Sequence, residues 1–221
     1  MILCIDTALE KCSIALCWNG DCIDVLTNDD TYKASEVLHL LIEKLLAKNN
    51  LTLKDIKAIA VNGGPGSYTG LRIGATTAKG LCYALDIPLI NVNGLRLMTE
   101  EILERYNITF DYYIPMIDAR RMEVFTCVFD QNMKPVMLPQ PLILTTDLFN
   151  EYNNNSVIIY GNGAQKAQEL LNKKDRIFVF DIEPSAKYFK NLVWNKWLSK
   201  EFENSNTYAP NYLKKFYSTS H

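Results

Sequence analysis

Residues 61–74 read VNGGPGSYTGLRIG and connect an expected apolar strand with an expected helix over about residues 69–85. Three glycines and a proline occupy positions 63–66, so the backbone there must adopt turn conformations that other residues resist. Ser67 and Thr69 are both good helix N-caps. Free backbone N–H groups and the helix dipole converge at such a turn, which is typical of an anion-binding site. An ordinary strand-to-helix turn with a cap fits the same residues, and the pattern alone leaves both interpretations open.

The composition fits a cytoplasmic globular protein of one large or two small domains. Of the 221 residues, 48% are apolar, which is enough for a full core, and the net charge is only −2. This balance does not indicate nucleic-acid binding by the chain alone. No apolar run approaches the roughly 18 residues of a transmembrane helix. The N-terminal segment is too short and too early charged for a signal peptide, so we expect no membrane association.

Six cysteines occur without a Cys-x-x-Cys pair, and several fall in strand-like runs. We interpret them as reduced core residues, since a free cysteine behaves as a small hydrophobe. The two histidines are His39, among apolar residues of a helix, and His221, the last residue. We interpret His39 as a packing or rim residue rather than a ligand. A zinc or iron site built on histidine is therefore almost excluded, and we expect no metal and no other cofactor.

The first half of the chain has the element order of a ribonuclease-H-like unit. Asn19-Gly20 is a strong signal for a type I′ hairpin turn between two alternating strands. Apolar periodicity places the other elements. The expected order is strands 2–6, 12–18 and 21–26, helix 34–48, strand 56–61, helix 69–85, strand 88–92 and helix 94–105.

The second half of the chain repeats this plan with weak identity but consistent order. Ile5-Asp6-Thr7-Ala8 and Ile117-Asp118-Ala119-Arg120 occupy matching places. So do Gly63-Gly64 and Gly161-Asn162-Gly163. The expected order is strands 112–117, 123–129 and 136–143, a short helix 147–152, strand 157–160, helix 164–172, strand 177–180 and helix 184–199.

The two halves together predict an α/β protein with a duplicated ribonuclease-H-like fold. The boundary is expected near residues 107–111, which gives an N-terminal half of residues 1–108 and a degenerate C-terminal half of residues 109–221 with a tail. A ribonuclease-H nuclease would gather four acidic groups on one sheet edge to hold two metals. Asp6 is in place for this, but the first half offers no convincing set of the other three. A nuclease is therefore not favoured.

The glycine-rich segment is not a Walker P-loop, because that motif closes with Gly-Lys-Ser or Gly-Lys-Thr. Here Gly70 is followed by Leu71 and Arg72. The Arg72 side chain could approach a phosphate, or it could be a solvated charge in the first turn of the helix. The sequence leaves these two roles open.

Two helices are more apolar than a one-sided surface helix requires. The helix over residues 69–85 contains three glycines, each costing up to about 1 kcal/mol against alanine, and close approach by neighbours would supply a reason for them. The helix over residues 34–48 has an apolar arc wider than the roughly 100° of a surface helix. This arc comprises Val37, Leu38, Leu40, Leu41, Ile42, Leu45 and Leu46. Either both helices are deeply buried within the chain, or their outer faces form an interface.

The run from Gly64 to Gly74 resembles the signature of the bacterial TsaB family, also called YeaZ. Supporting motifs follow in the same order along essentially the whole chain. They are Ile5-Asp6-Thr7, Ala78-Lys79-Gly80-Leu81, Asp118-Ala119-Arg120, Glu123-Val124-Phe125 and Pro210-Asn211-Tyr212-Leu213. The chain departs from the family at two places. Ala34-Ser35 stands where the family often has His-Ser, and Lys214 stands where its C-terminal motif usually ends in Arg.

The resemblance implies an actin-like or sugar-kinase-like fold. It also implies a role in placing threonylcarbamoyl on the adenosine next to the tRNA anticodon, for which the paralogue TsaD is the catalyst and TsaE an ATPase partner. TsaB-like chains pair with TsaD, or with themselves, through the helices that correspond to residues 34–48 and 69–85. The partner-binding residues expected from this resemblance are Val37, Leu38, Leu41, Leu45, Gly70, Ile73, Gly74, Thr77, Ala78 and Leu81.

Two sets of residues bear on chemistry by this chain itself. The catalytic relatives resemble residues 88–98 but carry two histidines one helical turn apart, a sound metal spacing. This chain has Gly94 and Met98 there, so we expect the metal site to be lost. In an actin-like fold the carboxylates of Asp6 and Asp118 face the interdomain cleft, where they could hold a magnesium nucleotide through water. Alternatively, each caps the turn that follows it. The residues of such a nucleotide or anion site are Asp6, Thr7, Gly64, Gly66, Ser67, Thr69, Arg72 and Asp118.

We predict a non-catalytic scaffold subunit of the tRNA threonylcarbamoyl transferase, a degenerate paralogue of TsaD. It would bind TsaD through the two helices, offer a surface to TsaE, form a homodimer when alone and meet tRNA only through the complex. The alternative is an independent actin-like phosphotransferase that uses Asp6, Asp118 and the glycine loops. A metallopeptidase is a weaker third hypothesis, against which the missing histidines argue.

Overall fold

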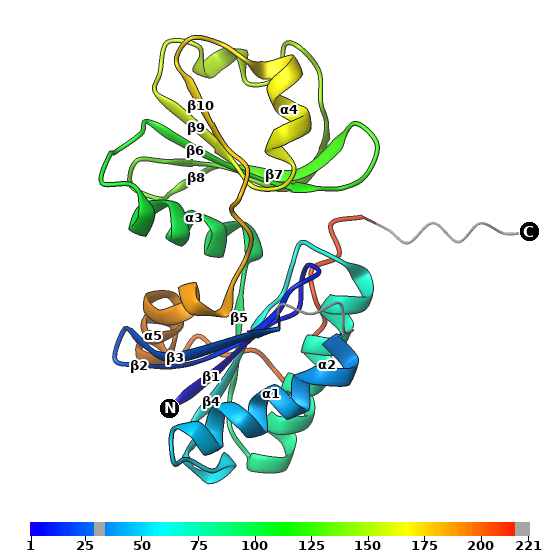
Figure 1. The fold of residues 1–221 in the computed structure, drawn as a ribbon, viewed down its shortest axis with the longest axis vertical. Coiled ribbons are helices and arrows are strands. Elements are labelled where there is room, and N and C mark those ends of the chain that lie inside the picture. Colours follow the sequence, from blue (N-terminus) through cyan, green and yellow to red (C-terminus); the bar gives the residue numbers. More distant parts are fainter. Residues whose placement is uncertain (29–33, 215–221) are drawn as a thin grey trace, which may run out of the picture. The chain divides into compact units, whose positions relative to one another are not determined.

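The structure is a computed structural model that describes residues 1–28 and 34–214, and the chain forms two compact units (Figure 1). Unit 1 comprises Met1–Leu97 and Pro184–Asn211, and unit 2 comprises Met98–Glu183 and the segment from Tyr212. His221 lies outside the described residues. Each unit is built on one five-stranded sheet with helices, which confirms the predicted α/β class and the duplicated ribonuclease-H-like fold.

The sheet of unit 1 has the strand order β3-β2-β1-β4-β5. β1 pairs antiparallel with β2 and parallel with β4, and β5 continues the parallel part. The bounds are β1 Ile2–Asp6, β2 Cys12–Trp18, β3 Asp21–Asn28, β4 Ala58–Asn62 and β5 Leu89–Val92. The predicted Asn19-Gly20 turn joins β2 to β3, and both residues have positive φ, as a type I′ turn requires.

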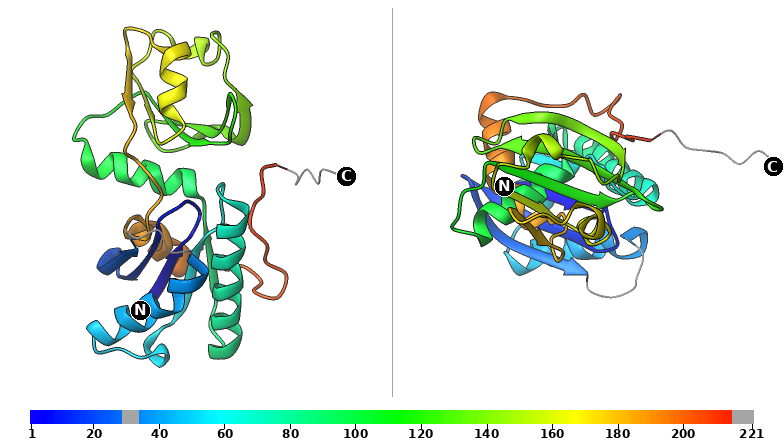
Figure 2. Two further views of the ribbon diagram at one scale, coloured as in Figure 1. Left: turned by 45° about the vertical axis from the view of Figure 1, so that its right-hand side comes forward. Right: turned by 90° about the horizontal axis from the view of Figure 1, so that it is seen from above.

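Helices cover both faces of this sheet, with α1 and α2 on one side and α5 on the other (Figure 2). The bounds are α1 Ala34–Lys48, α2 Tyr68–Leu85 and α5 Lys190–Ser199, the last preceded by a 3-10 turn, Ala186–Phe189. Successive residues of β1 alternate between these layers, as strand geometry requires. Leu3 and Ile5 join the core beneath α1 and α2, whereas Ile2 and Cys4 join the core beneath α5.

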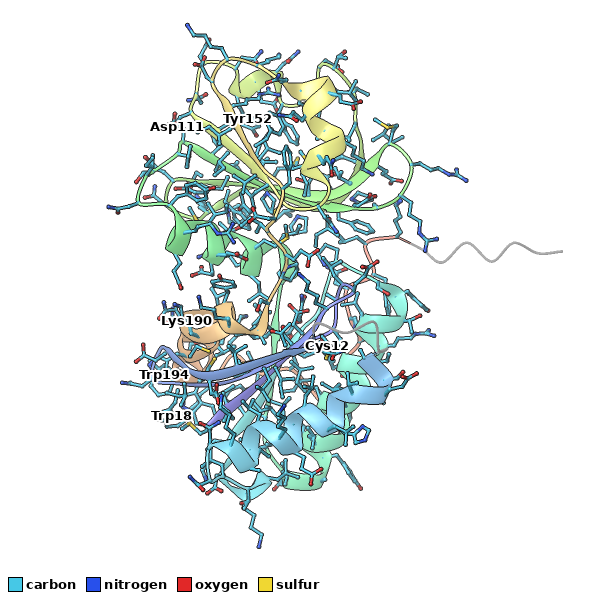
Figure 3. The ribbon with its side chains drawn as sticks, in the orientation of Figure 1. Cys12, Trp18, Asp111, Tyr152, Lys190 and Trp194 are labelled. Carbon is cyan, nitrogen blue, oxygen red and sulfur yellow. The ribbon has the colours of Figure 1, made fainter. Side chains whose placement is uncertain are left out.

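Aromatic residues pack α5 against the sheet. The rings of Trp18, at the end of β2, and Trp194, on α5, meet edge-to-face with centroids 5.0 Å apart (Figure 3). Trp197 lies one turn further along α5, and its ring centroid is 6.2 Å from that of Trp18. Such pairs stabilise a contact beyond the apolar area that they bury, so the C-terminal helix is an integral layer of unit 1.

Unit 2 repeats the sheet order of unit 1, because its strands run β8-β7-β6-β9-β10. The strand bounds are β6 Tyr112–Asp118, β7 Glu123–Asp130, β8 Pro135–Ile143, β9 Val157–Tyr160 and β10 Arg176–Val179. The helices are α3, Gly94–Arg105, and α4, Ala164–Leu171, which packs on one face of this sheet. None of the helices within residues 1–28 and 34–214 is long and apolar enough to cross a membrane.

The helix expected over residues 147–152 is instead a single 3-10 turn, Asn150–Tyr152. Phe149 before it adopts a left-handed conformation with φ of +63°, which an α-helix does not permit. The guanidinium of the buried Arg176 holds this conformation, since it donates a 2.7 Å hydrogen bond to the Phe149 carbonyl. The expected helix over 184–199 likewise opens with a 3-10 turn, where the Ser185 side chain accepts a hydrogen bond from the Lys187 N–H.

The halves drawn from sequence, residues 1–108 and 109–221, differ from the two units at two places. The part of α3 that begins at Met98 belongs to unit 2, where the Tyr160 hydroxyl donates a 2.6 Å hydrogen bond to Thr99. The segment Pro184–Asn211 belongs to unit 1. The helix that ends the second sequence half, and most of the helix that ends the first, thus belong to the other unit. Periodicity predicts that such a helix has an apolar face, but it does not identify the sheet that covers that face.

Candidate functional site

The N–H groups of the glycine turn are largely engaged within unit 1. Gly63 donates to the Val92 carbonyl at 2.9 Å, and Ser67 donates to the Ala8 carbonyl at 2.6 Å. Gly64 donates to the Asn62 side chain at 2.9 Å, and Gly70 to the hydroxyl of Ser67 at 3.3 Å. Ser67, rather than Thr69, is therefore the N-cap of α2. A phosphate cradle needs free N–H groups, and these four are not free.

The glycines of the turn allow α2 to press against the segment that follows β1. A Cβ atom at Gly66 would stand 2.3 Å from the Ala8 carbonyl oxygen, and one at Gly70 would stand 2.0 Å from the Thr7 carbonyl oxygen. A Cβ atom at Gly74 would stand 2.5 Å from the Thr7 hydroxyl. That hydroxyl donates a 2.7 Å hydrogen bond to the Gly70 carbonyl. The close approach inferred from the glycines of α2 is therefore made, at Gly70 and Gly74, inside this chain.

Asp6 links the end of β1 to the glycine turn. Its carboxylate is 1% exposed and accepts hydrogen bonds from the Ala8 N–H at 2.9 Å and from the Asn62 amide at 3.1 Å. The other end of that amide accepts the Gly64 N–H. Gly94 packs closely against the same amide, because a Cβ atom there would stand 2.9 Å from its nitrogen and oxygen. Asp6 thus caps the turn that follows it, as in the structural alternative.

Asp118 occupies the matching place in unit 2 but is exposed. Its carboxylate accepts hydrogen bonds from the Lys166 ammonium at 2.8 Å and from the Arg120 N–H at 2.6 Å. Partial burial alone would raise the pKa of Asp118, but the Lys166 and Arg120 hydrogen bonds outweigh it and hold that pKa below its usual range. Asp118 also caps its own turn, so both strand-end carboxylates are engaged by the protein itself.

Two further residues of the expected anion site lie at the exposed start of α2. Thr69 is exposed, and so is Arg72. The Arg72 guanidinium lies over the Tyr68 ring, 4.1 Å from the centroid, and donates a hydrogen bond to the Tyr68 hydroxyl. Arg72 is therefore held along the helix surface, which fits the interpretation as a solvated charge in the first turn.

Gly94 and Met98, where the resemblance implies histidines in catalytic relatives, are core positions here. Met98 is fully buried, and its methyl group would stand 2.2 Å from a Cβ atom at Gly161. Gly94 is buried as well. Within residues 1–28 and 34–214, no group of three or more His, Cys, Asp or Glu side chains is arranged to hold a metal ion.

Five of the ten expected partner-binding residues are used inside unit 1. Leu38, Leu45 and Ala78 belong to its core and are at most 3% exposed. Gly70 and Gly74 are buried against Thr7. These five residues therefore pack within the chain itself, and their partner-binding role stays a prediction.

The other five expected residues are half-buried along α1 and α2. They are Val37, Leu41, Ile73, Thr77 and Leu81. Thr77 and Leu81 line a groove of about 410 Å³ between α2, α1 and the turn that follows α1. The remaining lining residues are His39, Ile42, Glu43, Leu46, Ala47, Leu51, Thr52 and Leu53. His39 thus lies at the rim of an apolar groove, as its interpretation from sequence requires.

Three exposed residues of α1 and α2 are absent from the predicted set. Leu40 is 53% exposed and Tyr83 is 82% exposed. Gly80 lies in the interior of α2, yet no described atom beyond its own helix backbone and chain neighbours stands within 4 Å of where its Cβ would be. Leu40 falls within the apolar arc seen in the sequence, and an interior helix glycine is itself a signal for close packing. The apolar arc and the interior glycine could therefore have identified Leu40 and Gly80 from the sequence.

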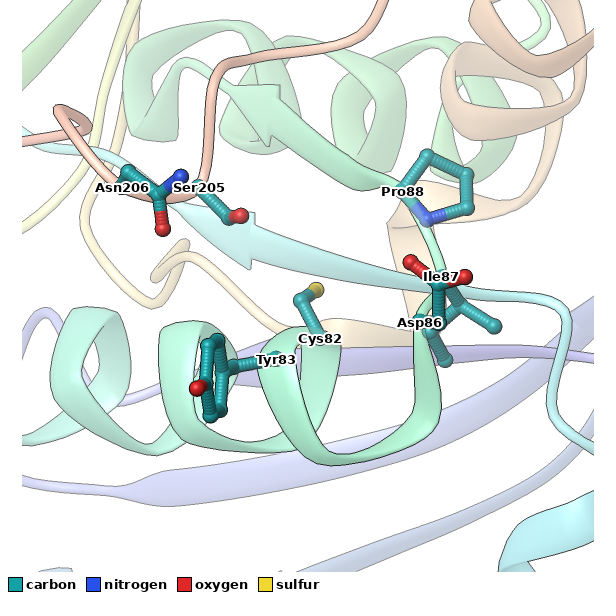
Figure 4. A pocket seen from close by; sticks show the side chains of 7 residues that line it. All are labelled: Cys82, Tyr83, Asp86, Ile87, Pro88, Ser205 and Asn206. Carbon is teal, nitrogen blue, oxygen red and sulfur yellow. The ribbon is translucent and has the colours of Figure 1, made fainter.

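A second pocket of about 540 Å³ lies at the C-terminal end of α2 (Figure 4). It is lined by Cys82, Tyr83, Asp86, Ile87, Pro88, Ser205 and Asn206. Burial raises the pKa of the Cys82 thiol to about 11, so this thiol stays protonated at neutral pH and is a poor nucleophile. The pocket therefore brings together polar groups without an activated nucleophile.

Comparison with known proteins gives a consistent result. A family model described as "TsaD: tRNA N6-adenosine threonylcarbamoyltransferase" matches residues 32–214. The chain is 26% identical to the tRNA threonylcarbamoyladenosine biosynthesis protein TsaB of Haemophilus influenzae, over 96% of this chain and 93% of that protein. It is 36% identical to the TsaB protein of Bacillus subtilis, over 58% of this chain and 54% of that one.

Among solved structures, YeaZ from Pseudomonas aeruginosa matches with a TM-score of 0.79. The two are 22% identical, and the match covers 96% of this chain and 99% of that one, which establishes a shared fold. The family model covers most of this chain, and the relatives named TsaB include one matched over nearly the full length of both proteins. The chain therefore belongs to the TsaB (YeaZ) family of tRNA threonylcarbamoyladenosine biosynthesis proteins, which is related to TsaD.

Proposed function

We propose that this chain serves tRNA threonylcarbamoyladenosine biosynthesis as a non-catalytic subunit that pairs with a TsaD-like paralogue. The name of its relatives supports the pathway, and the match to the TsaD family model supports the paralogous relation. In this role the chain orders the catalytic partner and offers a surface to a TsaE-like ATPase. It meets tRNA within the complex.

Three features of the structure support a non-catalytic role. The Asp6 carboxylate is buried and engaged by two donors. Four N–H groups of the glycine turn and the helix start, those of Gly63, Gly64, Ser67 and Gly70, are bonded within the chain. Gly94 and Met98 are buried and carry no metal-ligating side chain of the kind that the resemblance implies for catalytic relatives. A chain with these three features is suited to support chemistry in a partner rather than to perform it.

The observation that carries the pairing proposal is the apolar groove between α1 and α2. The groove is lined mainly by aliphatic side chains, and the half-buried Leu81 contributes from α2. Leu40 adds an exposed aliphatic side chain on α1. Helices of another chain can fill such a groove with their own apolar side chains, as ridges fill grooves in helix packing. When the paralogue is absent, a second copy of this chain occupies the same face, which gives the proposed homodimer.

The test is copurification with the TsaD-like paralogue, followed by a tRNA modification assay with and without this chain. Leu40→Glu should weaken pairing about tenfold or more, because it places a charge in an apolar contact. The variant should fold, since Leu40 is already 53% exposed. Leu198→Glu is the matched control, because Leu198 lies on α5 and is 63% exposed. Pairing that survives both Leu40→Glu and Thr77→Glu would refute the proposed interface.

The phosphotransferase alternative predicts that the isolated chain binds a magnesium nucleotide, which the proposed function does not. A non-catalytic subunit should show little heat when the isolated chain is titrated with ATP and magnesium. Micromolar affinity that is lost in Asp6→Asn would instead favour an actin-like phosphotransferase.

A further inference from the structure

The turn between β6 and β7 carries two adjacent arginines in an unfavourable backbone conformation. Arg120 has φ of +68° and Arg121 has φ of +49°, and both residues are exposed. Left-handed backbone is uncommon for residues other than glycine, and two such residues in succession need a structural reason. Backbone of this kind persists only where its surroundings hold it, which often happens at binding sites.

Two lysines hold this turn from within unit 2. The Lys166 ammonium donates hydrogen bonds to the Arg121 carbonyl at 2.8 Å and to the Glu123 carbonyl at 2.6 Å. The Lys214 ammonium donates to the Ala119 carbonyl at 3.2 Å. These contacts come from α4 and from the C-terminal segment, so two distant parts of the chain converge to fix one exposed turn.

The same lysines neutralise the acidic neighbours of the arginines. Lys166 pairs with the Asp118 carboxylate at 2.8 Å, and Lys214 pairs with the Glu123 carboxylate. Among the described residues, neither arginine guanidinium has a carboxylate or other side-chain partner. The two arginines and two lysines therefore carry four positive charges, and only two carboxylates neutralise them. The excess positive charge resides on the exposed guanidinium groups.

We propose that the Arg120-Arg121 turn binds the phosphodiester backbone of RNA. A guanidinium offers paired N–H donors that match phosphate oxygens, and it keeps its charge at any physiological pH. Adjacent arginines on a fixed turn present two such groups without the cost of ordering the backbone on binding. Contacts of this type position an RNA without reading its sequence. The proposal rests on the proposed function, because that function supplies tRNA as the RNA.

An extended polyanion suits this site better than a small free anion. The turn is exposed, and none of its residues lines either of the two pockets described above. A small anion gains affinity from an enclosing cradle of donors, whereas a polymer gains it by releasing counterions along an open basic surface. The turn adds local positive charge to a chain whose net charge is −2.

The test compares Arg120→Gln/Arg121→Gln with the unaltered chain in binding to an in vitro transcribed tRNA. The control, Lys134→Gln/Lys174→Gln, removes two other exposed positive charges of unit 2. Affinity is measured over a salt series, both for the chain alone and for its mixture with the TsaD-like paralogue. The arginine variant should bind tRNA about tenfold more weakly at ~0.1 M salt. The magnitude of its slope of log K against log salt should decrease by about 1 to 2. The control should change neither value appreciably, and the thermal midpoint of both variants should match that of the unaltered chain.

The outcomes separate this inference from the proposed function. If the pair forms and modifies tRNA but the arginine variant binds RNA as the unaltered chain does, the inference is overturned and the proposed function stands. An equal loss in the lysine control also overturns it, because the effect is then general charge. Displacement of the tRNA by millimolar inorganic phosphate at constant ionic strength would assign the turn to free anions instead. If no pair forms, the chain-alone series still decides the inference.

Discussion

Unit 1 and unit 2 use the same turn for different surfaces. Gly64 follows β4 and Gly161 follows β9, and both have φ of +106°. Each turn leads into a helix whose start packs against the end of the first strand of its own unit. A Cβ atom at Gly70, in α2, would meet Thr7 just after β1, and one at Gly163, the N-cap of α4, would meet Ile117 in β6. The strand orders of the two sheets are also the same. Sheet order and turn conformation are thus the shared part of the duplicated fold.

The helices and charges around this shared part differ. Unit 1 carries α1 with 15 residues and α2 with 18, and the apolar groove lies between them. At the places of these helices unit 2 has a three-residue 3-10 turn and α4 with eight residues. The carboxylate of Asp6 is buried, whereas that of Asp118 is exposed and paired with Lys166. Unit 1 thus has long helices with an apolar groove between them, whereas unit 2 has short helices and a basic turn.

The largest expected effect is a difference in stability between alanine substitutions of Gly70 in unit 1 and Gly163 in unit 2. Gly70→Ala would place a Cβ atom 2.0 Å from the backbone oxygen of Thr7, which cannot move without shifting β1. We expect a loss of about 3 kcal/mol in the free energy of unfolding, as for other overpacked sites. Gly163→Ala would place its Cβ atom 3.0 Å from Ile117, and we expect a loss of about 1 kcal/mol. Urea unfolding of each variant measures both values, and equal losses would contradict the difference in packing.

The next largest expected effect is a difference in stability between substitutions of the two strand-end carboxylates, Asp6 and Asp118. Asp6→Ala leaves the Ala8 N–H and the Asn62 amide buried without their acceptor, which should cost about 2 kcal/mol. Asp118→Ala removes an exposed pair with Lys166, so solvent screening limits the loss to about 0.5 kcal/mol. Urea unfolding at pH 7 gives both numbers. A loss in Asp118→Ala as large as that in Asp6→Ala would show that the two carboxylates are structurally equivalent.

The effect of Asp118→Ala should also depend on pH. The pKa of Asp118 is lower in the folded chain than its ordinary value of about 3.9. The carboxylate therefore stabilises the fold fully above about pH 5, and this contribution is lost as the pH falls through the folded-state pKa. The difference in unfolding free energy between the unaltered chain and Asp118→Ala should accordingly shrink as the pH falls below about 5. If this difference instead grows on acidification, the ionised Asp118 carboxylate does not stabilise the fold and the prediction is wrong.

Sequence reasoning anticipated the parts of this fold that short-range chemistry determines. Alternating apolar residues and the Asn19-Gly20 turn predict the strands of unit 1, and the polar cap at Ser67 predicts the start of α2 to within a residue. The missed parts depend on distant residues. Arg176 reaches back to the Phe149 carbonyl and stops a helix that local propensity favours. The sequence also shows that Gly70 requires a close neighbour, but only the fold identifies that neighbour as Thr7.

The smallest expected effect has the opposite sign to that of Gly70→Ala in the same helix. A Cβ atom at Gly80 would meet no described atom within 4 Å beyond its own helix and chain neighbours, and alanine is a better helix former by up to about 1 kcal/mol. Gly80→Ala should therefore raise the unfolding free energy of the chain by about 0.5 kcal/mol, measured at a dilution where sedimentation shows monomer. Nothing within residues 1–28 and 34–214 then accounts for a glycine at this position. If the helix of a partner approaches α2 there, the same variant should weaken pairing with the TsaD-like paralogue although it stabilises the monomer. Pairing that is unchanged or stronger in Gly80→Ala would mean that no partner helix approaches α2 at Gly80. The partner would then contact α2 only at the groove residues Thr77 and Leu81.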